Sequence, residues 1–279
     1  MKISFVVVNY NGSNFTQTFV TSVHKAMIDV ESLIVVVDNN SDSQDKDILS
    51  EIRDSYSNVI ILENDINVGY FSGINLGLDY LEQNKVTSDF VIIGNNDLII
   101  PEKFVQQLKN IENRLLEYPV ICPNLLDSKG THQNPHAVDE ITPLRICIWN
   151  LYYSYYWVAF LINLCSKNLS KWTKRNDEQK YQFSGEINEG YGACYILTPL
   201  FFKEFGRLFS PTFMNGEEFF LRVQLEKKGY KKYYESSITI IHNDHSTTSK
   251  MSSKEYWNMA KKAHETYIEV YKSFRKKME

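Results

Sequence analysis

Asparagine, aspartate and tyrosine side chains follow three apolar segments of the chain, each at the point where the segment ends. The segments are Ile3–Val8, Leu33–Val37 and Phe90–Ile93, and the polar residues after them are Asn9, Tyr10, Asn11, Asp38, Asn40, Asn95, Asn96 and Asp97. Amide and carboxylate oxygens are the ligands that a hard divalent ion such as Mg²⁺ or Mn²⁺ prefers. An ion held by Asp97 could neutralise a diphosphate leaving group. Turn formation alone also explains each cluster taken singly.

A second group of acids lies far along the chain, where Glu217 and Glu218 follow Gly216 at the predicted start of a helix. A carboxylate in such a place can take a proton from a substrate hydroxyl. Paired acids there also complement the helix dipole without any catalytic role. Arg222 follows one turn later, where it could orient an acid or a phosphate. These residue types alone leave both interpretations open.

A glycine-rich element, GINLG at residues 73–77, lies at another predicted helix start, where free N–H groups could meet an anion. Close packing of a helix on a sheet accounts for its glycines equally well. The sequence has neither GxGxxG after its first apolar segment nor GxxxxGK[ST] anywhere. It therefore disfavours the classical dehydrogenase and P-loop classes.

Alternation of apolar segments with helical spacing predicts the elements that position these side chains. In the first half, apolar residues recur with helical spacing between the strands, as in Ile74, Leu78 and Leu81. Apolar strands separated by helices predict an α/β fold with a mostly parallel, Rossmann-like sheet flanked by helices. Further strands are predicted at 193–197 and 233–241, and helices at 201–205, 217–228 and 255–277. Because ligands bind outside the carboxyl ends of such strands, the polar clusters are expected to meet at one edge.

Composition is that of a folded globular protein, with 279 residues, 43% hydrophobic and 23% charged. The net charge of −4 does not favour nucleic acid, and we expect no nucleic-acid partner. The four cysteines are scattered without metal or disulfide spacing, which fits a reducing compartment, and we expect a cytoplasmic protein.

One stretch, residues 146–166, has no charged side chain and is rich in tyrosine and tryptophan. Its length approaches that of a membrane span, but Asn150, Ser154 and Asn163 make it polar for one. Basic residues follow at Lys167, Lys171, Lys174 and Arg175. This composition leaves three interpretations open: contact with a membrane interface, which for a cytoplasmic protein would be the inner face of the cell membrane, a buried helical hairpin, or a homodimer contact.

Seven segments in order resemble the bacterial family 2 glycosyltransferases of GT-A fold, especially rhamnosyltransferase-like members. They are VVVNYNG, VVVDNNSDS, NVGYFSGINLG, IIGNNDLIIP, GACYILTPLFFKEFG, NGEEFFLRVQLEKKGY and YYESSITIIHNDHS. The resemblance implies a single GT-A domain over 1–279. Residues 1–125 would bind the nucleotide sugar and 126–250 the acceptor, with an insert at about 144–180 and a C-terminal helix over 251–279.

The resemblance also assigns roles to the candidate residues. Nucleotide contacts are implied for Asn9, Tyr10, Asn11, Asp38 and Asn40, and a lining of the donor pocket for Asn67, Gly69, Gly73 and Asn75. Asn95, Asn96 and Asp97 stand at the DxD motif, with asparagine replacing the first acid. Asp97 and His242, with His245 as a second histidine candidate, are the implied metal ligands. Glu218, where the family usually has aspartate, is the implied base, and Glu217 is the second candidate.

The implied function is inverting transfer of a sugar from a UDP- or dTDP-linked donor to a hydroxyl of a glycan or lipid-linked acceptor. An Asp38 carboxylate that accepts from a pyrimidine N3–H favours these nucleotides. The setting would be bacterial cell-surface polysaccharide synthesis, with Mg²⁺ or Mn²⁺ as cofactor. A non-catalytic binding module of the same fold is one alternative. A sugar-1-phosphate nucleotidyltransferase is another, although NYNGSNF lacks the basic, glycine-rich loop that it needs.

Overall fold

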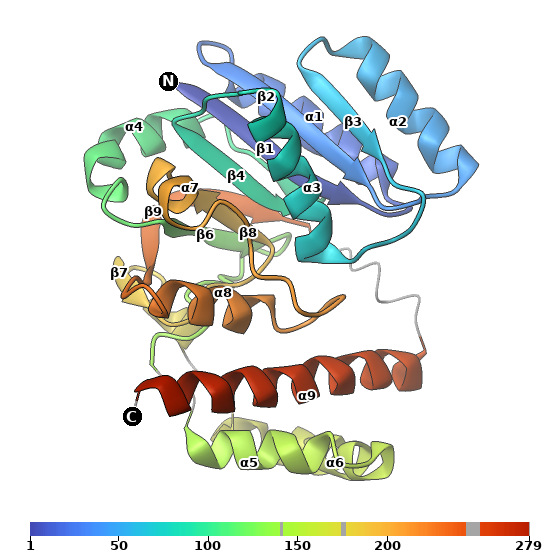
Figure 1. The fold of residues 1–279 in the computed structure, drawn as a ribbon, viewed down its shortest axis with the longest axis vertical. Coiled ribbons are helices and arrows are strands. Elements are labelled where there is room, and N and C mark those ends of the chain that lie inside the picture. The colour runs from blue at the N-terminus through green and yellow to red at the C-terminus, as the bar shows by residue number, and fades with distance from the viewer. Residues whose placement is uncertain (140–141, 174–176, 244–251, 279) are drawn as a thin grey trace.

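A computed structural model describes residues 1–139, 142–173, 177–243 and 252–278 of the chain. Within these residues nine strands form one sheet, in the order β3-β2-β1-β4-β8-β6-β9-β5, with β7 paired to β9 (Figure 1). The strands are β1 (Lys2–Asn9), β2 (Glu31–Asp38), β3 (Val59–Glu63), β4 (Phe90–Asn95), β5 (Leu98–Ile99), β6 (Val120–Asp127), β7 (Gly185–Ile187), β8 (Cys194–Leu197) and β9 (Lys232–His242). The mostly parallel α/β sheet predicted for the first half is confirmed.

Four parallel strands, β3, β2, β1 and β4, bring the polar residues of the first half to one edge. Asn9 at the end of β1 pairs in register with Asp38 at the end of β2, and Val8 pairs with Asn95 of β4. Strands that are buried on both faces need apolar side chains in both directions, which explains their continuous apolar runs. The sheet thus assembles the strand-end cluster that the sequence predicts.

Helices cover both faces of these strands. Helix α1 (Ser13–Ala26) and helix α2 (Ser43–Ser55) pack with α4 (Phe104–Leu115) on the face that carries Phe5. Helix α3 (Tyr70–Gln83) packs on the opposite face, where Ile74 and Leu78 meet Val6. Alternating side chains of each strand therefore feed two separate cores.

The second half of the chain completes the same sheet instead of forming one of its own. Strand β8 inserts antiparallel between β4 and β6, and β6 runs parallel to β9. The sequence analysis predicts no strand over β6, which contains Pro123, a residue that cannot donate to a ladder. In the structure the pairing of β6 with β9 shifts register between Pro123 and Asn124, which accommodates the proline.

The uncharged stretch forms a helical hairpin at one end of the molecule. Helix α5 (Pro143–Tyr152) and helix α6 (Tyr156–Thr173) pack on α9 (Ser253–Met278), which lies between them and α8 (Glu217–Glu226) (Figure 1). Helix α5 ends where the amide and hydroxyl of Ser154 both donate to the Leu151 carbonyl. No helix in the described ranges combines the length and apolar content that crossing a bilayer requires.

The remaining short elements are α7 (Pro199–Glu204) and a 3₁₀ turn at Asp177–Lys180. The helix predicted at 201–205 corresponds to α7, and that predicted at 217–228 corresponds to α8. Gly229, with φ +78°, follows the end of α8 in the left-handed conformation expected for a C-terminal cap.

Candidate active site

Asn9 is the centre of a buried network at the strand ends. Its amide donates to the side chains of Asp38 (3.0 Å), Ser41 (3.1 Å) and Asp45 (2.6 Å). Its carbonyl accepts from Asn96 at 2.9 Å and from Thr16. Because Asn9 is fully buried and these partners occupy both ends of its amide, its geometry serves to position its neighbours. Direct contact of Asn9 with a nucleotide stays a prediction.

Asp38 is equally enclosed. One carboxylate oxygen accepts from Asn9 and from the Ser41 hydroxyl, and the other accepts from the Ser41 amide at 3.1 Å. The side chain has no exposed surface in this structure. The predicted hydrogen bond to a pyrimidine base therefore requires Asp38 to be uncovered first, and it stays untested.

The accessible part of this edge consists of Tyr10, Asn11 and Asn40. Tyr10 is 39% exposed, and Asn40 is exposed at a backbone φ of +65°, a conformation that asparagine tolerates better than most residues. Asn11, at φ +50°, uses its side-chain oxygen to accept from the Asp42 amide. Of the predicted nucleotide-binding residues, Tyr10 and Asn40 have side chains that reach solvent.

The glycine-rich element of α3 is explained in large part by close packing. Gly69, at φ +89°, lies so close to the Phe213 carbonyl that an added Cβ would be 2.0 Å from it. A Cβ on Gly73 would meet Val8 of the sheet at 3.0 Å. Asn75 both donates to and accepts from the Leu208 backbone at 2.9 Å, and Asn67 accepts from the Gly69 amide. The packing interpretation of this motif therefore stands beside its predicted role at the donor pocket.

Asp97 and His242 form the second part of the site. Both are buried, and Oδ1 of Asp97 lies 3.3 Å from Nε2 of His242. The neighbouring Asn95 places its amide nitrogen 3.3 Å from the same ring nitrogen. Asn96 turns away to Asn9 and the Gly12 carbonyl. Three adjacent residues of one motif thus divide between the two parts of the site.

The geometry of this pair fits a divalent ion. Nδ1 of His242 lies 2.9 Å from Oε1 of Gln133, so that it donates its proton there and Nε2 keeps its lone pair toward Asp97. Two ligands at about 2.1 Å from one octahedral ion stand about 3 Å apart, close to the observed 3.3 Å. No group of three or more His, Cys, Asp or Glu suited to a metal occurs in the described part of the chain. An ion here would take its other ligands from substrate phosphates and water, as Mg²⁺ commonly does. His245 lies outside the described residues.

The acid pair opens α8 after two residues in left-handed conformation, Asn215 (φ +74°) and Gly216 (φ +88°). Burial, together with the charge of Glu218, raises the pKa of Glu217 to about 8. Glu218 is only half-buried, and its Oε1 accepts from the Gly192 amide at 3.1 Å. A carboxyl with a pKa of about 8 is mostly protonated at pH 7, which makes it the poorer base of the two. Of the two acids, the geometry therefore favours Glu218 as the base.

Tyr70 connects the acid pair with Asp97. Its hydroxyl donates to the Gly192 carbonyl at 2.9 Å, beside the amide that holds Glu218. Burial raises the pKa of Tyr70 well above its usual range, and the charges of Cys194, Glu217, Glu218 and Asp97 add to the effect. The acid pair on α8 and Asp97, which follows β4, thus affect one half-buried tyrosine that the sequence analysis did not single out.

Lys232 is a further residue that the sequence analysis missed. It is buried, and its Nζ donates to the Glu218 carbonyl at 2.6 Å. Burial lowers the pKa of Lys232. Arg222, predicted to orient an acid or a phosphate, pairs with Glu189 at 3.5 Å and Glu226 at 3.8 Å. Lys232 lies between two of the family segments and belongs to neither, so no motif indicates its role.

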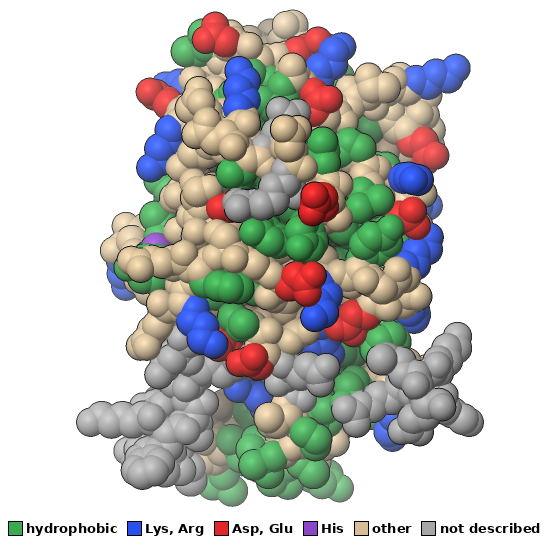
Figure 2. Space-filling view, turned by 90° about the vertical axis from the view of Figure 1, so that its left-hand side faces the viewer, with side chains coloured by type: hydrophobic (Ala, Val, Ile, Leu, Met, Phe, Trp, Pro, Cys, Tyr) green, Lys and Arg blue, Asp and Glu red, His purple; other side chains and the backbone are tan. Residues whose placement is uncertain are grey.

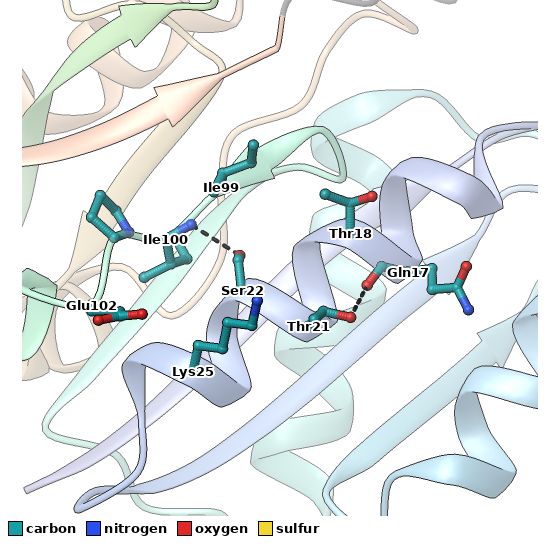
Figure 3. A pocket seen from close by; sticks show the side chains of 9 residues that line it. Gln17, Thr18, Thr21, Ser22, Lys25, Ile99, Ile100 and Glu102 are labelled. Atoms are coloured by element: carbon teal, nitrogen blue, oxygen red, sulfur yellow. Dashed lines mark hydrogen bonds between the residues drawn. The ribbon is translucent and has the colours of Figure 1, made fainter.

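Two cavities outlined by described residues lie away from these acids. One of about 500 Å³ runs along α1 beside the segment 99–102, and its Ser22 hydroxyl accepts from the Ile100 amide at 3.0 Å (Figure 3). The other, of about 370 Å³, lies between the end of α1 and Tyr56 at the end of α2. Neither cavity includes a predicted site residue, so the site is defined by its chemistry.

Comparison with known proteins agrees with the class that this fold and site define, an α/β enzyme acting at the carboxyl ends of its strands. The sequence matches the profile described as Glycosyl transferase family 2 over residues 4–142. The chain belongs to this family and has its GT-A fold. No curated protein sequence matches the chain significantly.

Solved structures with the same fold include complexes with nucleotide sugars or nucleotides. TarS 1–349 of S. aureus in complex with UDP-GlcNAc is 14% identical, with 90% of this chain and 62% of that chain covered and a TM-score of 0.54. GalNAc-T7 with UDP, GalNAc and Mn²⁺ is 14% identical, with 98% and 50% covered and a TM-score of 0.58. The mannosyltransferase PcManGT from Pyrobaculum calidifontis, in complex with GDP-Man and Mn²⁺, is 13% identical, with 86% and 56% covered and a TM-score of 0.52.

The chain spans only about half to three-fifths of the length of these structures. At such low identity the likeness extends to the fold. The family and the fold are shown, and the activity and substrates of this protein are a matter for proposal.

Proposed function

We propose that the protein transfers a sugar from a nucleotide diphosphate donor to an acceptor hydroxyl with inversion at the anomeric carbon. The observation that carries the proposal is that one short segment joins the two parts of the site: the Gly192 amide donates to Glu218, and the Ala193 carbonyl accepts from the Asn95 amide beside the Asp97–His242 pair. A base on α8 and a phosphate-facing site on β4 and β9 are the two parts that a single displacement requires.

In this mechanism Glu218 accepts the proton of the acceptor hydroxyl. The acceptor oxygen forms the bond to the anomeric carbon, and the bond from that carbon to the nucleotide diphosphate breaks. The Gly192 amide orients the Glu218 carboxylate, and Lys232 holds the backbone carbonyl of the same residue. Glu217, neutral at pH 7, avoids a second charge beside the base. Asp97 and His242 would hold Mg²⁺ or Mn²⁺, which supplies charge neutralisation for the leaving diphosphate.

The donor side of the proposal is a UDP- or dTDP-linked sugar, bound at the edge formed by Tyr10, Asn11 and Asn40. Solved relatives of the same fold carry UDP-GlcNAc, UDP with GalNAc and Mn²⁺, or GDP-Man with Mn²⁺. Residues 1–125 would bind the donor and 126–250 the acceptor. The acceptor we propose is a glycan or a lipid-linked glycan, in bacterial cell-surface polysaccharide synthesis at the cytoplasmic side.

Calorimetric titration with UDP, dTDP and GDP, each with and without Mn²⁺, tests the donor site directly. We expect Mn²⁺-dependent binding of a pyrimidine diphosphate to the native protein and its loss in Asp97→Ala. Asp127→Ala is the matched control, because Asp127 is bound within its own turn by the Lys129 and Thr131 amides. Failure of all three nucleotides to bind would overturn the proposal. Binding that ignores both the ion and Asp97 would remove the metal from it.

A non-catalytic module of the same fold is the second candidate, and the asparagine at position 95 is the observation that favours it. Asn95 provides an amide where the family has an acid, and it meets His242 at 3.3 Å. Release of free nucleotide diphosphate from a bound donor by the native protein, and not by Glu218→Gln, would exclude this candidate.

A further inference from the structure

Helix α6 presents an apolar stripe to solvent. Its exposed large side chains are Trp157 (74% exposed), Phe160 (52%), Leu161 (57%) and Leu164 (56%). These positions follow the spacing i, i+3, i+4, i+7, which places them on one face of the helix. In a helix that packs on a protein core, this spacing marks the buried face, and here it marks the outer one.

Helix α5 repeats the same arrangement. Leu144 (72%), Cys147, Ile148 (46%) and Leu151 (56%) are exposed at the same spacing. Tyr155, in the turn between the two helices, is 72% exposed. Two neighbouring helices with outward apolar stripes form a continuous hydrophobic end of the molecule, which we call the hairpin face (Figure 2). A patch of this kind marks an interaction surface.

The opposite side of the hairpin is already occupied by α9. Tyr156 packs on Trp257 with ring centroids 5.7 Å apart, and Trp149 packs on Tyr267 at 6.0 Å. The side-chain oxygen of Asn150 accepts a hydrogen bond from Nε2 of His264 at 2.8 Å. The hairpin is therefore anchored with its apolar stripes directed outward, and α9 cannot cover them without breaking these contacts.

Charge distinguishes among the surfaces that could cover the hairpin face. The sequence has no acidic residue from Thr142 to Arg175, and it has five basic ones, at Arg145, Lys167, Lys171, Lys174 and Arg175. The whole protein has a net charge of −4, so this concentration of positive charge is local. An apolar helix face with tryptophan, tyrosine and basic residues matches an anionic bilayer surface.

We propose that the hairpin face docks into the interfacial region of a membrane that contains anionic lipid, with α5 and α6 lying in the plane of the bilayer. Trp157, Phe160 and Leu161 enter the boundary between headgroups and acyl chains, and the positive net charge of the sequence from 142 to 175 favours anionic lipid. This inference does not depend on the proposed function, because it rests on exposure, spacing and charge in a different part of the molecule.

Flotation of the full chain with lipid vesicles tests the proposal. We expect binding to vesicles of phosphatidylcholine mixed with phosphatidylglycerol, weaker binding to phosphatidylcholine alone, and a loss of binding as salt is raised. Replacing two exposed apolar side chains in Trp157→Ser/Leu161→Ser should lower the apparent affinity at least about tenfold. The matched control is Ile28→Ser/Ile66→Ser, since these residues are 82% and 66% exposed elsewhere on the surface.

The proposal fails if the native protein binds neither kind of vesicle, or if Trp157→Ser/Leu161→Ser binds as well as the control. Light scattering after gel filtration measures the molar mass of the protein in solution and so tests whether a second copy of the chain covers the hairpin face instead. A dimer that the hairpin substitutions dissociate, without vesicle binding by the native protein, would assign the face to self-association and overturn the proposal. Circular dichroism and thermal melting of both double variants show whether they are folded.

Discussion

The polar residues at the strand ends fall into two groups that differ in how their side chains are used. Around Asn9, the amides, hydroxyls and carboxylates bond to one another, and Asp38 is completely enclosed. Around Tyr70, the acid pair and Asp97 bring three carboxyl groups to one region, where Glu217 keeps its proton at pH 7. The polar groups of the first cluster satisfy one another's hydrogen bonds. The acids of the second cluster could take up a hydroxyl proton or bind a cation. Residue type alone does not distinguish structural residues from candidate catalytic ones. Their hydrogen-bond partners do.

The largest effect that would sharpen this comparison is expected from Glu218→Gln. Loss of the general base should reduce turnover by about 10²–10⁴-fold and leave the melting temperature close to native. The half-buried amide can still accept from Gly192, so the fold is kept. Release of nucleotide diphosphate from a donor gives the rate. Native turnover in this variant would show that Glu218 is not the base.

The second prediction concerns Glu217 and pH. With a folded pKa of about 8 against 4.5 unfolded, Glu217 keeps a proton that the unfolded chain releases. Its contribution to the stability of the fold is therefore fully present below pH 4.5 and lost as pH rises to 8, on the order of 5 kcal/mol. Glu217→Gln, which cannot ionise, should be more stable than the native protein at pH 9 by a similar amount.

Urea unfolding of native and Glu217→Gln protein at pH 6 and pH 9 measures this difference. Glu186→Gln is the control, because Glu186 is exposed and pairs with Lys231 at the surface. Equal pH dependence in native and Glu217→Gln protein would show that Glu217 does not hold the proton.

The third prediction reverses the pattern of the first. Asn9→Ala should lower the free energy of unfolding by about 2 kcal/mol, because Asp38 and Asn96 lose buried partners. Nucleotide affinity would then fall only to the extent that the substitution disorders the strand ends around Tyr10 and Asn40. The comparison between the two groups breaks if Asn9→Ala is as stable as native and yet loses nucleotide binding, since Asn9 would then contact the ligand directly.

The smallest effect is expected from Asn40→Gly. Glycine adopts the φ of +65° at this exposed position without strain, so stability should change by less than about 0.5 kcal/mol. A measurable fall in nucleotide affinity, determined by calorimetry beside Asn14→Gly or another exposed control, would support Asn40 as a donor contact. Unchanged affinity would remove it from the predicted set.

Much of the fold could be predicted from sequence because its strands are buried on both faces. Continuous apolar runs such as Phe90–Ile93 ended at polar turns, and each became a strand of the predicted sheet. Strand β6 could not be predicted, since Pro123 argues against a strand and only the bulge against β9 makes it tolerable. The antiparallel insertion of β8 likewise depends on long-range pairing that no local pattern encodes.

The sequence predicts which residues come together at the candidate site better than it predicts what each of them does there. The parallel register explains why Asn9, Asp38 and Asn95 come together. Whether a side chain faces its neighbours or the site depends on hydrogen bonds between distant segments, such as that between Lys232 and the Glu218 carbonyl. A helical hairpin was one of the interpretations of the uncharged stretch. The outward direction of its apolar stripes could not be predicted, because it depends on the packing of Trp257 against Tyr156.

Two adjacent residues of α9 fix the distance between the acid pair and the hairpin. Tyr256 donates to the side chain of Asn215, just before the acid pair, and Trp257 packs on Tyr156 of the hairpin. One helix diameter for α9 and another for the hairpin, each about 10 Å, separate the acids from the hairpin face by roughly 20 Å. On a bilayer, a hydroxyl attached directly to a lipid phosphate would lie too low to be reached. The spacing would then select for chains that already carry sugars, so that α9 would act as a ruler for acceptor length.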